Sequence, residues 1–168
     1  MGLEEEIYQW NPYKGLGNIS FYFSELELVN VLGKPDDLLE NRQADDSQTR
    51  NYHYHNLAVI VSFVCTIDKR MFVRVSSGKI FLKKEALHLL SFRQLLAKLR
   101  REFVAYTGIF ADGHPAPSEK IVEYKRIKTH HGKAESLQYA FPYLGAVFWY
   151  ENGRMVNALV QLPEPLNW

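Results

Sequence analysis

Four histidines come closest, in this chain, to the spacing of a metal site. His53 and His55 alternate with tyrosines in Tyr52-His53-Tyr54-His55, and residues two apart on a strand point to the same side. Two imidazoles at that spacing could bind a transition metal, with His130 and His131 as further ligands. The sequence offers no carboxylate or cysteine at a defined motif spacing to complete the set. We therefore interpret His53 and His55 as a hydrogen-bonding surface pair, and we expect neither a bound metal nor any other cofactor.

The sequence motifs of common enzyme classes are absent. The chain contains no Gly-x-Ser-x-Gly elbow, no glycine-rich phosphate loop, no His-Glu-x-x-His and no Cys-His family signature. Its single cysteine, Cys65, lies in an apolar run, which is typical of a small buried hydrophobe and excludes a disulfide framework. We expect a protein that acts without catalysis by binding another protein. A small enzyme or a ligand-binding module of unknown substrate is the alternative.

The charged residues nearly balance, with 20 Lys and Arg against 19 Asp and Glu. The chain therefore lacks the global basic field that non-specific nucleic-acid binding needs, and we expect no direct contact with nucleic acid. A partner would be recognised by a local surface. The acidic, polar stretch Asp36 to Arg50 predicts a mobile loop that could attract a basic partner. A basic patch could also form from Lys83, Lys84, Lys98, Arg100 and Arg101.

The segment Glu119 to Lys128, which reads EKIVEYKRIK, is the main candidate for partner binding. Apolar and charged residues alternate imperfectly in it, which is typical of an exposed edge strand. The backbone of such an edge can pair with a strand of a partner. Side chains that could select the partner strand are Glu123, Tyr124, Lys125 and Arg126, and nearby Phe110 could add an apolar anchor. The alternative is a solvated edge with a structural tyrosine.

These residues must be positioned by β-structure, and the strongest structural signal is the stretch Tyr139 to Gln161. Two runs rich in aromatic and β-branched residues flank Asn152-Gly153, and both of these residues tolerate positive φ, so the stretch predicts a β-hairpin. An earlier stretch has a related plan. Leu57 to Thr66 predicts a central strand, Met71 to Val75 predicts its antiparallel neighbour, and Lys79 to Leu82 could add a third strand.

Capping boxes predict two helices. Ser24 with Glu27 opens a helix from about Glu25 to Leu32, which Gly33 and Pro35 would end. Its buried face is expected to contain Leu28, Val31 and Leu32. Ser91 with Gln94 opens a second helix from about Phe92 to Phe103, with its basic residues on the polar side.

The order of these elements predicts one α+β domain over residues 1–168. Each half, residues 19–82 and 91–162, would consist of a capped helix followed by a β-meander, and the strand cores Tyr54 to Phe63 and Tyr139 to Phe148 share a pattern. The two halves would form an antiparallel sheet with the helices covering one face. Trp10 to Gly17 would lead in as an extended arm, and Thr107 to Ser118 would be a surface loop.

Residues Met1 to Tyr8 contain three glutamates and no apolar segment of the kind found in secretory signals. No apolar run approaches the roughly 20 residues that a membrane-spanning helix needs. We therefore expect a cytoplasmic protein that does not associate with a membrane.

Three segments carry a resemblance to a known family: Asn11 to Gly17, the capped helix of Ser24 to Pro35 that ends in Leu-Gly-Lys-Pro, and Tyr139 to Gly153 with its Leu-Gly-x-x-Phe-Trp core. Together they resemble the small α+β immunity proteins that accompany bacterial contact-dependent growth-inhibition toxins and related polymorphic toxins. Helices ending in Leu-Gly-x-Pro also occur in BLIP-like inhibitors and in outer-membrane assembly lipoproteins. The absence of a signal and of a lipobox cysteine argues against the lipoprotein interpretation.

The resemblance implies a cytoplasmic antidote that binds the C-terminal domain of one cognate toxin, often a nuclease, and blocks its active site or its substrate access. Some members of the family accept a toxin β-hairpin alongside their own sheet. Binding faces diverge widely among immunity proteins, so the resemblance assigns no role to any numbered residue of this chain.

Overall fold

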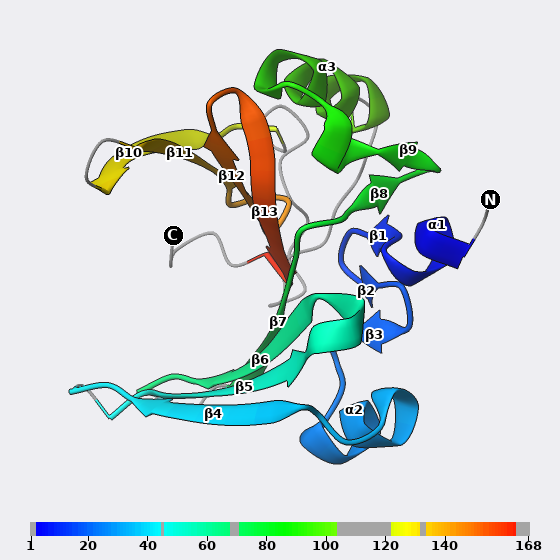
Figure 1. Ribbon diagram of the computed structural model, residues 1–168, viewed down its shortest axis with the longest axis vertical. Helices are drawn as coiled ribbons and strands as arrows, with labels where there is room; N and C mark the ends of the chain where they lie inside the picture. Colours follow the sequence, from blue (N-terminus) through cyan, green and yellow to red (C-terminus); the bar gives the residue numbers. More distant parts are fainter. Residues whose placement is uncertain (1–2, 45, 68–70, 104–121, 132–133, 164–168) are drawn as a thin grey trace.

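The computed structural model describes residues 3–44, 46–67, 71–103, 122–131 and 134–163 (Figure 1). The predicted loop over residues 107–118, the start of the candidate segment at residues 119–121, and Phe110 lie outside the described residues.

The chain forms one eight-stranded antiparallel sheet with the strand order β10-β11-β12-β13-β7-β6-β5-β4. Its first four strands in sequence are β4 (Asp37–Arg42), β5 (Gln48–Tyr54), β6 (Val59–Cys65) and β7 (Met71–Ser77). Its last four are β10 (Lys125–His131), β11 (Ala134–Phe141), β12 (Ala146–Glu151) and β13 (Arg154–Gln161). The predicted α+β class, with two meanders in one antiparallel sheet, is confirmed.

A capped helix precedes each meander. Helix α2 (Glu25–Leu32) and helix α3 (Phe92–Phe103) both have the predicted bounds and the predicted capping boxes. Both lie on the same side of the sheet, together with the shorter elements of the chain (Figure 1). These are α1 (Leu3–Ile7), β1 (Trp10–Asn11), β2 (Gly15–Leu16), β3 (Ile19–Ser20), η1 (His55–Leu57), β8 (Phe81–Leu82), β9 (Glu85–Ala86) and η2 (Leu87–Leu89).

The two meanders are related by a pseudo-two-fold axis that passes through the pair Ser76 and Leu159. Four-residue connections follow Tyr54 and Phe141, and each ends in a residue with positive φ, Ala58 at 51° and Gly145 at 67°. Because the two connections have equal length, each residue of the first meander has an equivalent in the second. The rotation maps Ser77 onto Val160 and Val75 onto Ala158, so it exchanges the pairs Ser77–Ala158 and Val75–Val160 at the seam, where β7 pairs with β13. Tyr52 is therefore equivalent to Tyr139. The alignment expected from sequence, Tyr54 with Tyr139, is wrong by two residues.

The core lies between the sheet and the helices. Residues on alternate positions of the strands are buried there, including Val61, Val75, Phe148 and Val160. The N-terminal residues Trp10 to Gly17 were expected to form an extended arm. They instead contain strands β1 and β2 of a small sheet that β3 completes, and Trp10 and Leu16 are almost fully buried because their apolar side chains belong to the hydrophobic core.

Four further expectations need correction. The described part of Asp36 to Arg50 is not a loop, because it contains β4 and the start of its antiparallel neighbour β5; it is polar because all six residues of the edge strand β4 are exposed. Val31 is 47% exposed, since only Leu28 and Leu32 of the expected set turn toward the core. The predicted third strand at Lys79 to Leu82 does not join the main sheet; Phe81 and Leu82 pair with β9. Cys65 is half-buried at the end of β6.

The predicted hairpin at Asn152 and Gly153 is confirmed, and it allows a test of turn chemistry. The two residues have φ of 52° and 76°, and a Cβ added at Gly153 would meet no atom within 4 Å. Any cost of Gly153→Val therefore comes from the backbone conformation. We expect Gly153→Val to lower the free energy of unfolding by about 1–3 kcal/mol in denaturant titrations.

A matched control is Gly78→Ala, whose added Cβ would lie at an ordinary 3.8 Å from the carbonyl oxygen of Val156. We expect this control to change stability by less than about 1 kcal/mol. Equal stabilities of Gly153→Val and wild type would contradict the role of the turn.

Candidate functional site

Among the residues that the structure describes, strand β10 is one of the two edges of the main sheet without a further pairing strand, as the sequence predicted for this segment, although the strand begins at Lys125 rather than at Glu119. Lys125, Arg126, Ile127 and Lys128 are all exposed. Glu123 and Tyr124 precede the strand and are exposed as well. The structure thus brings four of the five candidate residues together along one edge.

Aromatic side chains fix this edge to helix α3. Phe92, the first residue of the helix, stacks on Tyr139 of β11 with ring centroids 3.5 Å apart and planes 9° apart. Tyr124 packs edge-on against Phe92 at 5.1 Å and against Tyr139 at 6.0 Å. Each aromatic pair of this kind stabilises the folded state by about 0.5–1.5 kcal/mol beyond the contribution of the apolar area that it buries. Tyr124 is therefore a structural residue, and 37% of its surface remains exposed.

A buried hydroxyl ties the same cluster to the start of α3. Tyr150 of β12 donates a hydrogen bond of 3.0 Å to the carbonyl oxygen of Leu90, directly before the cap of the helix. Burial strongly raises the pKa of this hydroxyl, so it stays protonated and remains a donor over the physiological range. Phe141 and Phe148 complete the packing below it at 5.7 Å from each other. The edge strand is thus attached to a rigid base.

The charges of the edge are available to a partner. Among the described residues, neither Lys125 nor Arg126 makes an ion pair, and consecutive strand residues place their side chains on opposite faces of the sheet. Lys128 lies 3.4 Å from Glu135 in a solvent-exposed pair, which contributes little. The edge therefore presents positive charge on both faces, with the 48% exposed Ile127 between the charges.

The opposite edge, β4, was not found by sequence reasoning. The equivalence of the two edges follows from their pairing with β5 and β11, which are related by the pseudo-two-fold axis. Asp37 is equivalent to Lys125, Leu39 to Ile127, and Glu40 to Lys128. Both edges thus have an exposed apolar residue at the centre of the same face, but the flanking charges are opposite in sign. The adjacent Leu38 and Leu39 were the only apolar signal in this short segment, and the surrounding polar residues obscured it.

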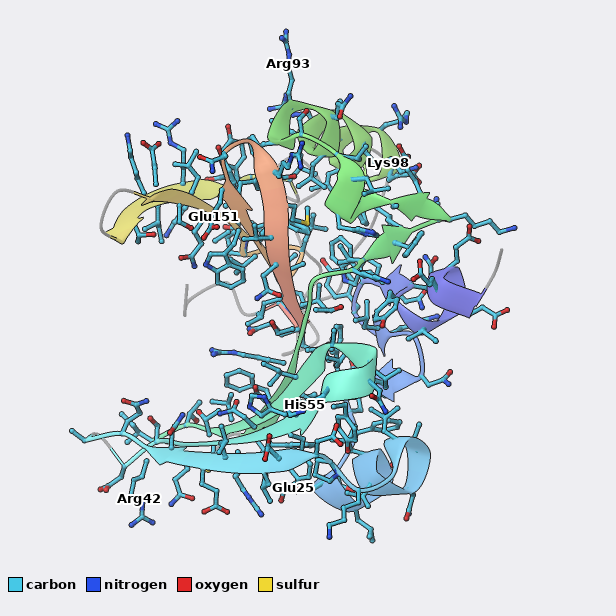
Figure 2. The ribbon with its side chains drawn as sticks, in the orientation of Figure 1. Glu25, Arg42, His55, Arg93, Lys98 and Glu151 are labelled. Carbon is cyan, nitrogen blue, oxygen red and sulfur yellow. The ribbon has the colours of Figure 1, made fainter. Side chains whose placement is uncertain are left out.

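The hypothetical basic patch does not form as expected, because two of its members are neutralised. Lys98 is buried rather than on the polar side of α3, and its Nζ lies 2.9 Å from carboxylate oxygens of both Glu85 and Glu102. Lys83 pairs with Glu102 at 2.8 Å. Figure 2 shows Lys98 on the side of α3 that faces β9, whereas Arg93 points away from the protein. This ion-pair network attaches α3 to the β8–β9 hairpin.

The histidines give no complete metal site. The rings of His53 and His55 are 6.4 Å apart, and Nε2 of His55 lies 3.1 Å from a carboxylate oxygen of Asp37. His55 belongs to η1 and not to β5, so the two residues do not alternate along one strand as expected. The side chains of His130 and His131 lie outside the described part. Within the described part, no three His, Cys, Asp or Glu residues are grouped to hold a metal.

A row of polar side chains on the face opposite the helices was also missed. Ser62 donates to Asn51 at 2.6 Å, Arg74 donates to Gln161 at 2.8 Å, and Asn157 donates to Ser76 at 2.9 Å. The last two bonds cross the seam between β7 and β13. Ser62 lies between the buried Val61 and Phe63 of β6, and this alternation is the signal that could have indicated the row.

Comparisons with known proteins give no assignment: no family model, no curated protein and no solved structure matches this chain. None of the described helices has the length and apolar character needed to cross a membrane.

The ion-pair network at α3 leads to a prediction about pH. The hydrogen bonds from Lys83 and Lys98 hold the pKa of Glu102 below its ordinary value of 4.5. A carboxyl whose pKa is lowered by folding contributes stability that is present above its unfolded pKa and is lost as pH falls through the folded pKa. We expect Glu102→Gln to lower the free energy of unfolding by about 1–3 kcal/mol at pH 7, because Lys98 then keeps only Glu85.

The difference between Glu102→Gln and wild type should shrink as the pH falls below 4.5, the ordinary pKa of glutamate. Urea titrations at a series of pH values measure it, with Glu135→Gln, an exposed partner of Lys128, as the control. A difference that stays constant with pH, or an equal effect of the control, would show that the network does not anchor α3.

A second prediction concerns metals. Because the described histidines and carboxylates do not form a ligand set, we expect purified protein to contain no stoichiometric transition metal. Addition of a chelator should leave its Tm unchanged. Elemental analysis that finds one zinc ion per chain would contradict the expectation.

Proposed function

We propose that this chain is an immunity protein that acts in the cytoplasm, where it binds the C-terminal domain of one cognate toxin, of nuclease type, and neutralises it by protein–protein contact. The proposal combines the family resemblance of the sequence with one structural observation. That observation is the free edge β10, which is basic, exposed and attached to a rigid aromatic base.

A free edge strand can bind a protein by adding one of the partner's strands to its own sheet. The unpaired backbone N–H and C=O groups of β10 supply hydrogen bonds that do not depend on the partner's sequence. The side chains then determine which strand is accepted: Lys125 on one face and Arg126 on the other favour acidic neighbours. The rigid base keeps the edge extended before binding, which reduces the entropy lost on association.

The sign of the charge indicates how a nuclease would be blocked. A surface that binds nucleic acid is itself basic because it must neutralise phosphates. The basic edge β10 would be repelled by such a surface, so we infer that it contacts an acidic segment beside the nucleic-acid groove. Inhibition would then result from steric exclusion of the substrate, and not from mimicry of its phosphates.

The test is co-expression with the toxin domain encoded next to this gene. We expect the wild-type chain to restore colony formation, and the double charge reversal Lys125→Glu/Arg126→Glu to weaken the complex about tenfold or more in calorimetric titrations, because both faces of the edge lose their attraction. The affinity of the wild type should also fall with added salt. Charge reversal is preferred to a proline at Tyr124, because Tyr124 packs against Phe92 and Tyr139.

The matched control is Arg100→Glu/Arg154→Glu, which reverses two exposed charges away from the edge. Circular dichroism verifies that each variant is folded. Failure of the wild type to protect cells would contradict the immunity function. Protection with unchanged affinity of the Lys125→Glu/Arg126→Glu variant would place the interface elsewhere on the protein.

A further inference from the structure

Strand β4, the other edge of the main sheet within the described ranges, differs from β10 in what it can pair with. All six residues of β4 are exposed, and Leu38 and Leu39 are 41% and 54% exposed, one on each face of the sheet. The strand contains neither a proline nor a bulge, and its register with β5 is regular over all six pairs. An edge with these properties is a template for another strand.

The hydrogen bonds of the hairpin show which backbone groups of β4 point outward. The amide of Gln43 donates to the carbonyl oxygen of Ser47 at 2.8 Å, so these two residues form a hydrogen-bonded pair. Such pairs alternate with non-bonded pairs along an antiparallel ladder. Residues 37, 39 and 41 therefore bond to β5, and the N–H and C=O groups of residues 38, 40 and 42 point to the open edge.

A second copy of β4 satisfies these groups in one register. Consider two antiparallel copies related by a two-fold axis perpendicular to the sheet. The rotation keeps each side chain on its own face of the sheet, and paired residues share a face. The numbers of two paired residues are therefore both odd or both even, and their sum is even. With Leu39 on the axis, the outward groups of Leu38 meet those of Glu40 of the second copy. Leu39 then lies opposite Leu39 in a non-bonded pair, in which side chains approach most closely.

Charge also selects this register. With Leu39 on the axis, Arg42 of each copy, at the end of β4 where Figure 2 shows it, would lie near Asp36 of the other. Asp36 directly precedes β4, and its exposed carboxylate accepts a hydrogen bond of 2.7 Å from the amide of His55. Asp37 lies opposite the neutral Asn41. A shift of the axis to Glu40 would place Glu40 opposite Glu40, and a shift to Leu38 would place Asp36 opposite Glu40. Like charges directly opposite are destabilising in both cases. The strand is therefore self-complementary in one register and not in either adjacent one.

The β10 edge cannot pair with itself in the same way. Ile127 is the equivalent of Leu39. If Ile127 lay on the axis, Arg126 of each copy would lie opposite Lys128 of the other, which gives two pairs of like charges. Repulsion between these charges protects β10 from self-association and leaves it open to another protein.

We propose that the chain forms a symmetric dimer through β4, with Leu39 of the two copies in contact at the axis, so that one continuous sheet of sixteen strands carries a free β10 at each end. This inference rests on the β4 geometry alone and does not depend on the proposed function. It gives the complex with any β10 partner a stoichiometry of two to two.

The test uses the purified full chain. We expect sedimentation analysis over about a hundredfold range of concentration to reveal a reversible dimer. Leu39→Lys should raise the dissociation constant of the dimer at least about tenfold, because it places two like charges opposite each other in a close pair. The matched variant Ile127→Lys changes the equivalent exposed position on the other edge and should leave the dimer intact. Circular dichroism checks that both variants are folded.

Cross-linking tests the register. In a Cys65→Ser background, Leu39→Cys places two thiols across a non-bonded pair, a geometry that a disulfide fits, so mild oxidation should give a covalent dimer that dithiothreitol reverses. Glu40→Cys, which would cross-link in the shifted register, and Ile127→Cys should give little. A monomeric mass at every concentration, or cross-linking of either control as efficient as that of Leu39→Cys, would overturn the proposal.

Discussion

The pairing of β7 with β13 is the interaction on which the rest of the structure depends. Four residue pairs, from Arg74–Gln161 to Ser77–Ala158, join two meanders that otherwise pair only within themselves. The seam is strengthened by hydrogen bonds of Arg74 with Gln161 and of Asn157 with Ser76, which link residues more than 80 positions apart in sequence. Without this seam each meander would expose a central strand, and the core between the sheet and the helices would be divided. The two free edges exist in their present places because the last strands of both halves are used at the centre.

The pseudo-symmetry of the halves extends to the contacts that hold each helix. Glu25 is the first residue of α2 and Phe92 is the first residue of α3, and each contacts the equivalent tyrosine of its meander. In the first half the contact is a hydrogen bond of 2.9 Å from Tyr52 to Glu25, and in the second it is the stacking of Phe92 on Tyr139. The same position is thus filled by a polar contact near β4 and by an aromatic one near β10. At this position the β10 half therefore uses an aromatic contact and the β4 half a charged one, since Glu25 also pairs with Arg50.

Features set by local chemistry could be predicted from the sequence, and features set by distant partners could not. The helix bounds followed from Ser24 and Ser91, whose caps act within three residues, and the hairpin followed from Asn152 and Gly153. The strand β4 was mistaken for a loop because an edge strand buries neither face, so its composition resembles that of a loop. Lys98 was predicted to be exposed because it is charged. Its burial depends on Glu102, one turn away in α3, and on Glu85, which lies outside the helix and could not be identified as a partner from the sequence.

The candidate edge was predictable as an edge, because its alternating charges are local. Its attachment to α3 was not, because Phe92 and Tyr139 are far apart in the sequence. The equivalence of the two edges was likewise invisible, since it depends on the register of both meanders and on a correct alignment of Tyr52 with Tyr139.

The seam also has a consequence for synthesis of the protein on the ribosome. All pairings of the first meander are between neighbouring strands, so β4 to β7 can assemble as soon as Ser77 has emerged. Strand β7 then waits for β13, the last strand to be made, and until that moment it is an unprotected edge containing Val73 and Val75. The nascent chain therefore exposes an unpaired edge throughout translation of its second half, and unpaired edges of this kind favour aggregation.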